Sequence, residues 1–116
     1  MEQQREQYHQ TIREHLKSSY LLTEEKIEAV LPKFLDSVKN LMSELEQVLH
    51  TNDNYAISRT GHAMKGALLN LGLHDLAQMA FSIEKHQENN ATCQDCVQLA
   101  GELKQEVVKF CSFQDM

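Results

Sequence analysis

The chain has few residues that interrupt or crosslink a fold. Its 116 residues include one proline, four glycines, three cysteines and no tryptophan, and aromatic residues make up only 6%. So little proline and glycine disfavours a fold of short strands and tight turns, and an odd number of cysteines argues against a disulfide framework. No apolar run approaches the ~20 residues of a membrane span, and no signal-peptide pattern opens the chain. We therefore expect a soluble, cytoplasmic protein with no membrane contact.

Basic residues are also scarce. The chain has 11 Lys and Arg residues against 17 Asp and Glu residues, a formal net charge of -6. A nucleic-acid-binding domain normally shows a basic face, so we expect no nucleic-acid partner. The length fits one domain with a single core.

Apolar residues recur at helical spacing along most of the chain, amid abundant Leu, Glu, Gln and Lys. The short turns between the later helices favour antiparallel neighbours. We predict an all-α fold, an antiparallel four-helix bundle over residues 23–113 with an additional N-terminal helix and connection over residues 1–22, in a single domain. The expected helices cover residues 2–18, 24–50, 53–71, 74–87 and the region from residue 92 onward.

Four positions shape the expected helix ends. Thr23 is a plausible N-cap, and Asp53 or Asn52 can cap the third helix. Gly72 stands where a left-handed residue would end that helix. Pro32 removes a backbone donor inside the second helix and predicts either a break or a kink there. The unbroken phase of the apolar stripe favours the kink.

Cys93 and Cys96 form a CxxC pair, which could be a redox pair or half of a zinc site. Neither a second CxxC nor a histidine pair at zinc-finger spacing follows, and no βαβ pattern surrounds the pair. We interpret Cys96 as a core residue of the last helix, together with Val97, and Cys111 as a packing residue.

The most informative stretch runs from Gly61 to Gly72 and contains a histidine, a lysine and a second glycine at helical spacing. On a helical projection one stripe of this helix is apolar and should face the core. Lys65 lies on the flank, one turn from His62. The opposite side, which should face solvent, carries Tyr55, His62, Gly66 and Leu69.

This arrangement suits phosphoryl chemistry. A neutral imidazole is a nucleophile near physiological pH and can accept a phosphoryl group without a separate strong base. Lys65 supplies a positive charge and donors for phosphate oxygens. Glycine inside a helix costs about 1 kcal/mol relative to alanine, so Gly66 suggests a need for open space beside His62.

The motif His62-x-x-Lys65-Gly66-Ala67, with the later Ile83-Glu84 pair, closely resembles the signature of histidine phosphotransfer (HPt) domains of two-component phosphorelays. The resemblance covers roughly residues 20 to 110. It implies a four-helix bundle whose exposed histidine carries a phosphoryl group to or from receiver-domain aspartates. It also implies that Glu84 accepts a hydrogen bond from the imidazole and so orients it.

From this resemblance we expect His62 to be the phosphoacceptor and Lys65 the phosphate clamp, in a covalent carrier without a kinase or ATP site. The expected partner is the receiver domain of a response regulator or of a hybrid sensor histidine kinase. Tyr55 and Leu69, apolar and outward beside the reacting group, suit its docking. We expect no cofactor or metal in this chain, Mg²⁺ on the partner receiver, and a monomeric protein.

Three other interpretations stay open. An HPt-like helical module that carries no phosphate could regulate a sensor kinase by contact alone. The six histidines and many carboxylates could form a metal-binding bundle, although such a site needs inward-facing His and Glu side chains. A dimeric signalling bundle, in which the first helix pairs or exchanges, could coexist with phosphotransfer.

Overall fold

The structure is a computed structural model that describes residues 2–51, 53–88 and 93–111. These residues form helices and turns and contain no strand, which confirms the predicted all-α class. The helices are α1 (Glu2–Ser19), α2 (Glu24–Val48), α3 (Asn54–Asn70), α4 (His74–Glu88) and α5 (Cys93–Val107).

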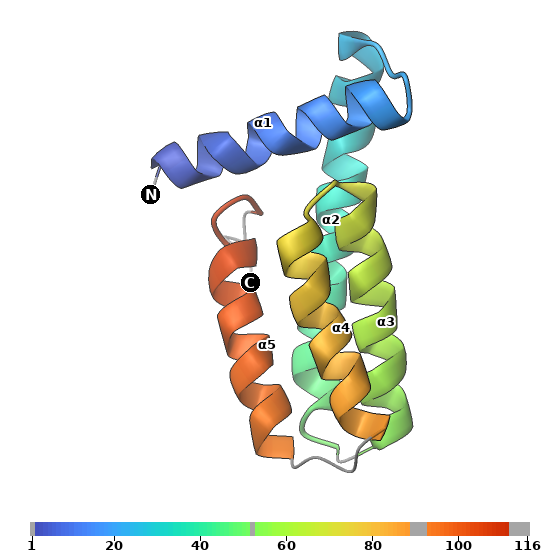
Figure 1. The fold of residues 1–116 in the computed structure, drawn as a ribbon, viewed down its shortest axis with the longest axis vertical. Helices are drawn as coiled ribbons and strands as arrows, with labels where there is room; N and C mark the ends of the chain where they lie inside the picture. The colour runs from blue at the N-terminus through green and yellow to red at the C-terminus, as the bar shows by residue number, and fades with distance from the viewer. Residues whose placement is uncertain (1, 52, 89–92, 112–116) are drawn as a thin grey trace.

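Helices α2 to α5 stand side by side as an antiparallel bundle (Figure 1). Helix α3 packs against α2 and α4, and α5 packs against α4 and α2, so the four helices close a ring around one core. Helix α1 lies across one end of this bundle (Figure 1). The predicted four-helix bundle with an additional N-terminal helix is therefore confirmed.

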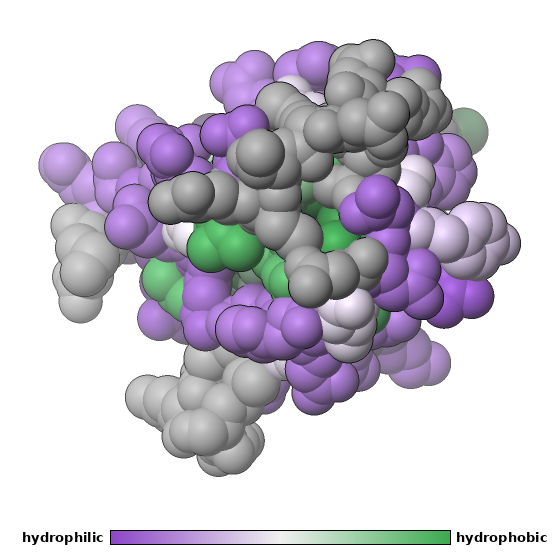
Figure 2. Space-filling model, turned by 90° about the horizontal axis from the view of Figure 1, so that it is seen from below, coloured by the Kyte–Doolittle hydropathy of each residue, from purple (hydrophilic) through white to green (hydrophobic). Residues whose placement is uncertain are grey.

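The core contains side chains from all five helices. Each helix supplies at least one of the largest fully buried side chains. Burying such a side chain contributes about 1.5–3 kcal/mol to the stability of the fold. They include Ile12, Leu16, Ile27, Met42, Leu45, Ile57, Met64, Leu68, Ile83 and Leu103. At the end of the bundle remote from α1, mostly hydrophilic residues surround a few apolar ones (Figure 2).

The local signals place the helix ends as predicted. The Thr23 side chain accepts a hydrogen bond from the Lys26 N–H at 3.2 Å, and the Asp53 side chain accepts one from the Ala56 N–H at 3.1 Å. Gly72 has a φ of +76°, the left-handed conformation that ends α3.

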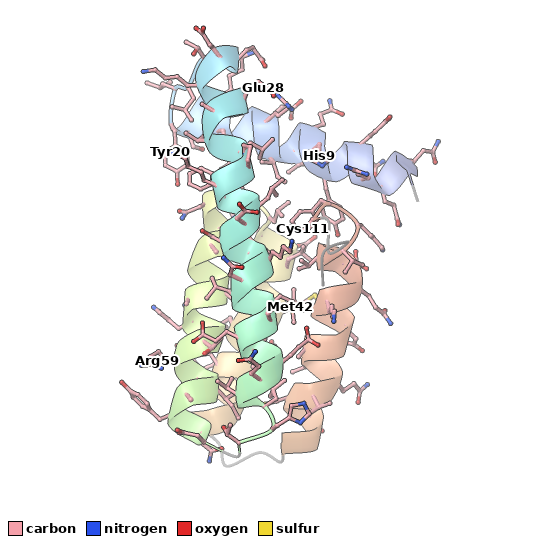
Figure 3. The ribbon with its side chains drawn as sticks, turned by 180° about the vertical axis from the view of Figure 1, so that it is seen from behind. His9, Tyr20, Glu28, Met42, Arg59 and Cys111 are labelled. Carbon is pink, nitrogen blue, oxygen red and sulfur yellow. The ribbon has the colours of Figure 1, made fainter. Side chains whose placement is uncertain are left out.

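Pro32 does not break the second helix, because α2 continues from Glu24 to Val48 with this proline inside it. Proline cannot donate a hydrogen bond to the carbonyl of Glu28, one turn earlier. Both residues are exposed, and Glu28 is labelled near the start of α2 in Figure 3. Water can therefore bind that carbonyl. The exposed position explains how the helix tolerates Pro32.

Buried apolar residues hold helix α1 on the bundle, and Tyr8 in its N-terminal half adds polar and aromatic contacts. The Tyr8 hydroxyl donates to Glu106 Oε1 at 2.6 Å, and the Tyr8 ring lies 4.9 Å from the Phe110 ring. Hydrogen bonds from Lys109 and Tyr8 hold the pKa of Glu106 below its ordinary value.

Two cysteines lie in the core as predicted, whereas Val97 does not. Cys96 and Cys111 are buried and form no disulfide with each other, and burial raises the pKa of the Cys111 thiol to about 12. Both are packing residues, as predicted. The side chain of Cys93 lies outside the described residues. Val97 was expected in the core but is 51% exposed, because Cys96 and Ala100 occupy the inward side of α5.

The described part of the chain contains neither a candidate membrane-spanning helix nor a candidate metal-binding cluster. Within residues 2–51, 53–88 and 93–111, no helix has the length and apolarity that a membrane span requires. The same residues contain no group of three or more His, Cys, Asp or Glu side chains placed to hold a metal ion.

Candidate functional site

Helix α3 separates a buried side from an exposed side. Ile57, Met64 and Leu68 are completely buried, so the apolar stripe fixes the rotation of the helix. His62 consequently faces outward, and 66% of its side chain is exposed. The structure thus places the imidazole where a partner protein can reach it.

Gly61, next to His62 in the chain, lies on the buried side of α3. A Cβ atom at this position would lie 3.3 Å from the Glu84 backbone N and 3.4 Å from the Ala80 carbonyl oxygen. The missing side chain therefore lets the α4 backbone approach α3 closely. Figure 1 shows the two helices side by side. This approach brings Glu84 beside His62.

Glu84 on α4 contacts the ring of His62 on α3. His62 Nδ1 lies 3.2 Å from Glu84 Oε2 and 3.4 Å from Oε1. Only 16% of the Glu84 side chain is exposed, so the carboxylate is held in place by its surroundings. A carboxylate at Nδ1 favours the tautomer with the proton on Nδ1 and leaves Nε2 with its lone pair.

Lys65 lies against the same carboxylate. Its Nζ is 3.6 Å from Glu84 Oε1 and 4.9 Å from the centroid of the Phe81 ring. Lys85 Nζ lies 5.3 Å from that ring. Both ammonium groups therefore lie near the Phe81 ring, and that of Lys65 also contacts the carboxylate that lies beside His62.

Gly66 provides open space one turn from His62. A Cβ atom built there meets no atom within 4 Å. Beside it, a groove between α2 and α3 is lined by apolar and small polar residues. They are Phe34, Ser37, Leu41, Ala63, Gly66, Ala67 and Asn70.

Tyr55 and Leu69 flank His62 along the exposed side of α3. They lie seven residues before and after it, about 10 Å away along the helix axis in each direction. Their exposed fractions are 74% and 40%. Arg59 lies 5.7 Å from the Tyr55 ring and projects from the outside of α3 (Figure 3).

The predicted site residues thus fall into two groups. His62, Lys65 and Glu84 are in direct contact through the Glu84 carboxylate, with Gly66 next to them. Tyr55 and Leu69 stand apart at the two ends of the exposed side.

The sequence interpretation missed three residues that shape this site. Gly61 sets the spacing of α3 and α4, while Phe81 and Lys85 line the environment of Lys65. The available signal for Gly61 was a helix-interior glycine on the buried shoulder beside the histidine. Phe81 and Lys85 lie three residues before and one residue after Glu84. This spacing indicates a role at the site only when the contact of α4 with His62 is known.

Comparison with known proteins gives one decisive match: the sequence fits the Hpt domain family over residues 29–110. The chain belongs to the Hpt domain family. Neither the curated proteins nor the solved structures gave a significant match. Hpt domains are phosphocarrier modules of two-component phosphorelays that interact with receiver domains. The matched range of this Hpt domain contains His62 and Glu84 but neither α1 nor the connection that follows it.

Proposed function

We propose that this protein accepts a phosphoryl group on His62 Nε2 and exchanges it with aspartates of receiver domains. The contact between Glu84 and His62 Nδ1 is the observation that carries the proposal. On a ring that is largely exposed, this contact leaves Nε2 as the nucleophilic nitrogen turned away from the carboxylate.

In the forward step, the Nε2 lone pair attacks the phosphorus of a receiver aspartyl phosphate. The N–P bond forms while the bond from phosphorus to the aspartate oxygen breaks, and the aspartate leaves as a carboxylate. The imidazole keeps its Nδ1 proton and becomes positively charged. Glu84 stabilises that charge, so no separate base is required. The reverse sequence returns the phosphoryl group to a second receiver.

Lys65 and Gly66 would assist in different ways. The Lys65 ammonium group is close enough to Glu84 to exchange that partner for a phosphoryl oxygen on the neighbouring ring. The open space at Gly66 admits the phosphoryl group and the receiver loops that deliver it. We expect the receiver to hold the Mg²⁺ ion that neutralises most of the transferring charge.

The proposed partner is a receiver domain of a response regulator or of a hybrid sensor histidine kinase, and the reaction takes place in the cytoplasm. The protein acts as a monomer. It is a carrier, because its phosphohistidine is the product of one transfer and the donor of the next. Tyr55 and Leu69 supply apolar contacts on either side of the histidine.

Intact-mass spectrometry after incubation with phosphorylated receiver domains tests this function. The wild type should gain the mass of one phosphoryl group, and that gain should disappear in acid because a phosphohistidine is acid-labile. His62→Gln should gain nothing while keeping the helical circular dichroism, because residue 62 is exposed. Binding to a sensor kinase without any transfer from a panel of receivers would instead support the contact-only regulator.

A further inference from the structure

The connection between α1 and α2 has an unusual residue at its turn. Leu21 has a φ of +55°, the only non-glycine positive φ in the described residues, and 84% of it is exposed. Asparagine and glycine adopt this left-handed conformation far more readily than leucine does. Leucine at this position therefore does not stabilise the fold, because its backbone conformation is unfavourable and its side chain is not buried.

Neighbouring hydrogen bonds hold this backbone conformation in place. The Leu16 carbonyl oxygen accepts hydrogen bonds from the N–H groups of both Tyr20 and Leu22, each at 3.3 Å. Leu22 is partly buried and packs against the core. The end of α1 thus requires a left-handed residue at position 21, and the sequence supplies leucine. Helices commonly end at a left-handed residue, usually glycine or asparagine, so the unusual feature here is the exposed leucine side chain.

Tyr20 connects this turn to the groove between α2 and α3. Its hydroxyl donates to Asn70 Oδ1 at 3.2 Å, and Asn70 lines the groove between α2 and α3 together with Gly66. Tyr20 is itself 48% exposed. In Figure 3 it lies on the same side of the bundle as Arg59, near the other end of α3.

The size of a protein interface brings this turn within reach of anything that docks on His62. A stable interface covers about 800 Å² on each partner, a patch roughly 30 Å across. Asn70 lies eight residues after His62, about 12 Å along the axis of α3. A receiver centred on His62 would therefore extend to Asn70 and the tyrosine bonded to it.

The composition of the turn also fits an interface. Residues 18–23 contain no charged side chain, whereas 24% of the whole chain is charged. Interface centres are depleted in charged residues and enriched in tyrosine.

We infer that Tyr20 and Leu21 form part of the receiver-docking surface and help to select the partner. This inference rests on the proposed phosphotransfer. It assigns a binding role to a segment outside the range that matches the Hpt domain family.

The test uses the full chain and the receiver that phosphorylates the wild type fastest, locked in its active form with beryllofluoride. Titration calorimetry measures the Kd of wild type, Leu21→Asn and Leu21→Met. Leu21→Asn should weaken binding about fivefold or more, as loss of an apolar interface contact does. Its urea unfolding midpoint should be unchanged or higher, because asparagine relieves the strained backbone. Leu21→Met should bind like the wild type.

Val97→Asn is the matched control, since Val97 is also an exposed apolar residue but lies on α5, away from α3. It should leave the Kd unchanged. Leu21→Gly repeats the test if asparagine disturbs the fold. A Kd for Leu21→Asn within twofold of the wild type would overturn the inference while the proposed function stands. Failure of every receiver to phosphorylate the wild type would overturn both.

Discussion

The two sides of α3 carry the same residue type for opposite purposes. On the inner side, Gly61 removes a side chain so that the α4 backbone can approach, and a Cβ there would meet two backbone atoms within 3.4 Å. On the outer side, Gly66 faces open space. The first glycine lets Glu84 lie beside His62, and in the proposed function the second leaves room for the phosphoryl group. In the proposed function, the inner side of α3 therefore serves the packing of the bundle and its outer side serves phosphotransfer.

This separation has an energetic consequence. Ile57, Met64 and Leu68 are fully buried, and each stabilises the fold by about 1.5–3 kcal/mol. Exposed residues such as His62 contribute little to stability, because replacing them leaves no cavity and no unpaired buried group. Substitutions on the inner side should change stability, and those on the outer side should change transfer.

The largest effect is expected at the inner glycine. Gly61→Leu forces a side chain into the seam between α3 and α4, and we expect it to lower the free energy of unfolding by about 3 kcal/mol. Urea denaturation followed by circular dichroism measures this change. An unfolding midpoint equal to that of the wild type would show that the two helices are not held at this distance.

A smaller effect, on rate, is expected at Lys65. Lys65→Ala should slow phosphotransfer about tenfold, because the variant loses a charge-assisted contact to the phosphoryl group. The unfolding midpoint should not change. Rapid-quench transfer from a phosphorylated receiver gives the rate.

Lys85→Ala is the control for Lys65→Ala, because it removes the same charge from the other lysine beside the Phe81 ring. Its effect on the rate should be clearly smaller. Equal slowing by the two substitutions would mean that only the general positive field matters and that Lys65 is not a specific clamp.

At the outer glycine, the expected change in stability is smaller than at Gly61 and opposite in sign. Gly66→Ala should raise the free energy of unfolding by about 1 kcal/mol, because alanine is the better helix former and its Cβ meets no atom. Transfer should nevertheless slow, since the methyl group occupies space beside His62. A stabilised variant that transfers at the wild-type rate would refute the access role of Gly66.

Local features of the sequence were sufficient to predict much of this molecule. The apolar stripe of α3 correctly predicts that His62, Tyr55 and Leu69 face outward. The caps at Thr23 and Asp53 follow from short side chains that bind nearby backbone N–H groups. These features depend on residues within one or two helical turns, which is why periodicity and capping rules identify them.

Features that depend on how helices meet were harder to predict. The roles of Gly61 and Phe81 depend on the distance and rotation of α4 against α3, which no single-helix pattern contains. Val97 was misplaced because the buried side of α5 is narrower than its apolar pattern suggests. The bond from Tyr20 to Asn70 joins residues that are far apart in the chain, so only the folded structure reveals it.

Long-range ¹H–¹⁵N NMR of the phosphorylated protein tests the central claim most directly, because it identifies which imidazole nitrogen of His62 carries the phosphoryl group. The contact of Glu84 with Nδ1 predicts phosphorylation at Nε2, with Nδ1 protonated and bound to the carboxylate. A phosphoryl group on Nδ1 would contradict the account, because it would occupy the position that the structure gives to Glu84.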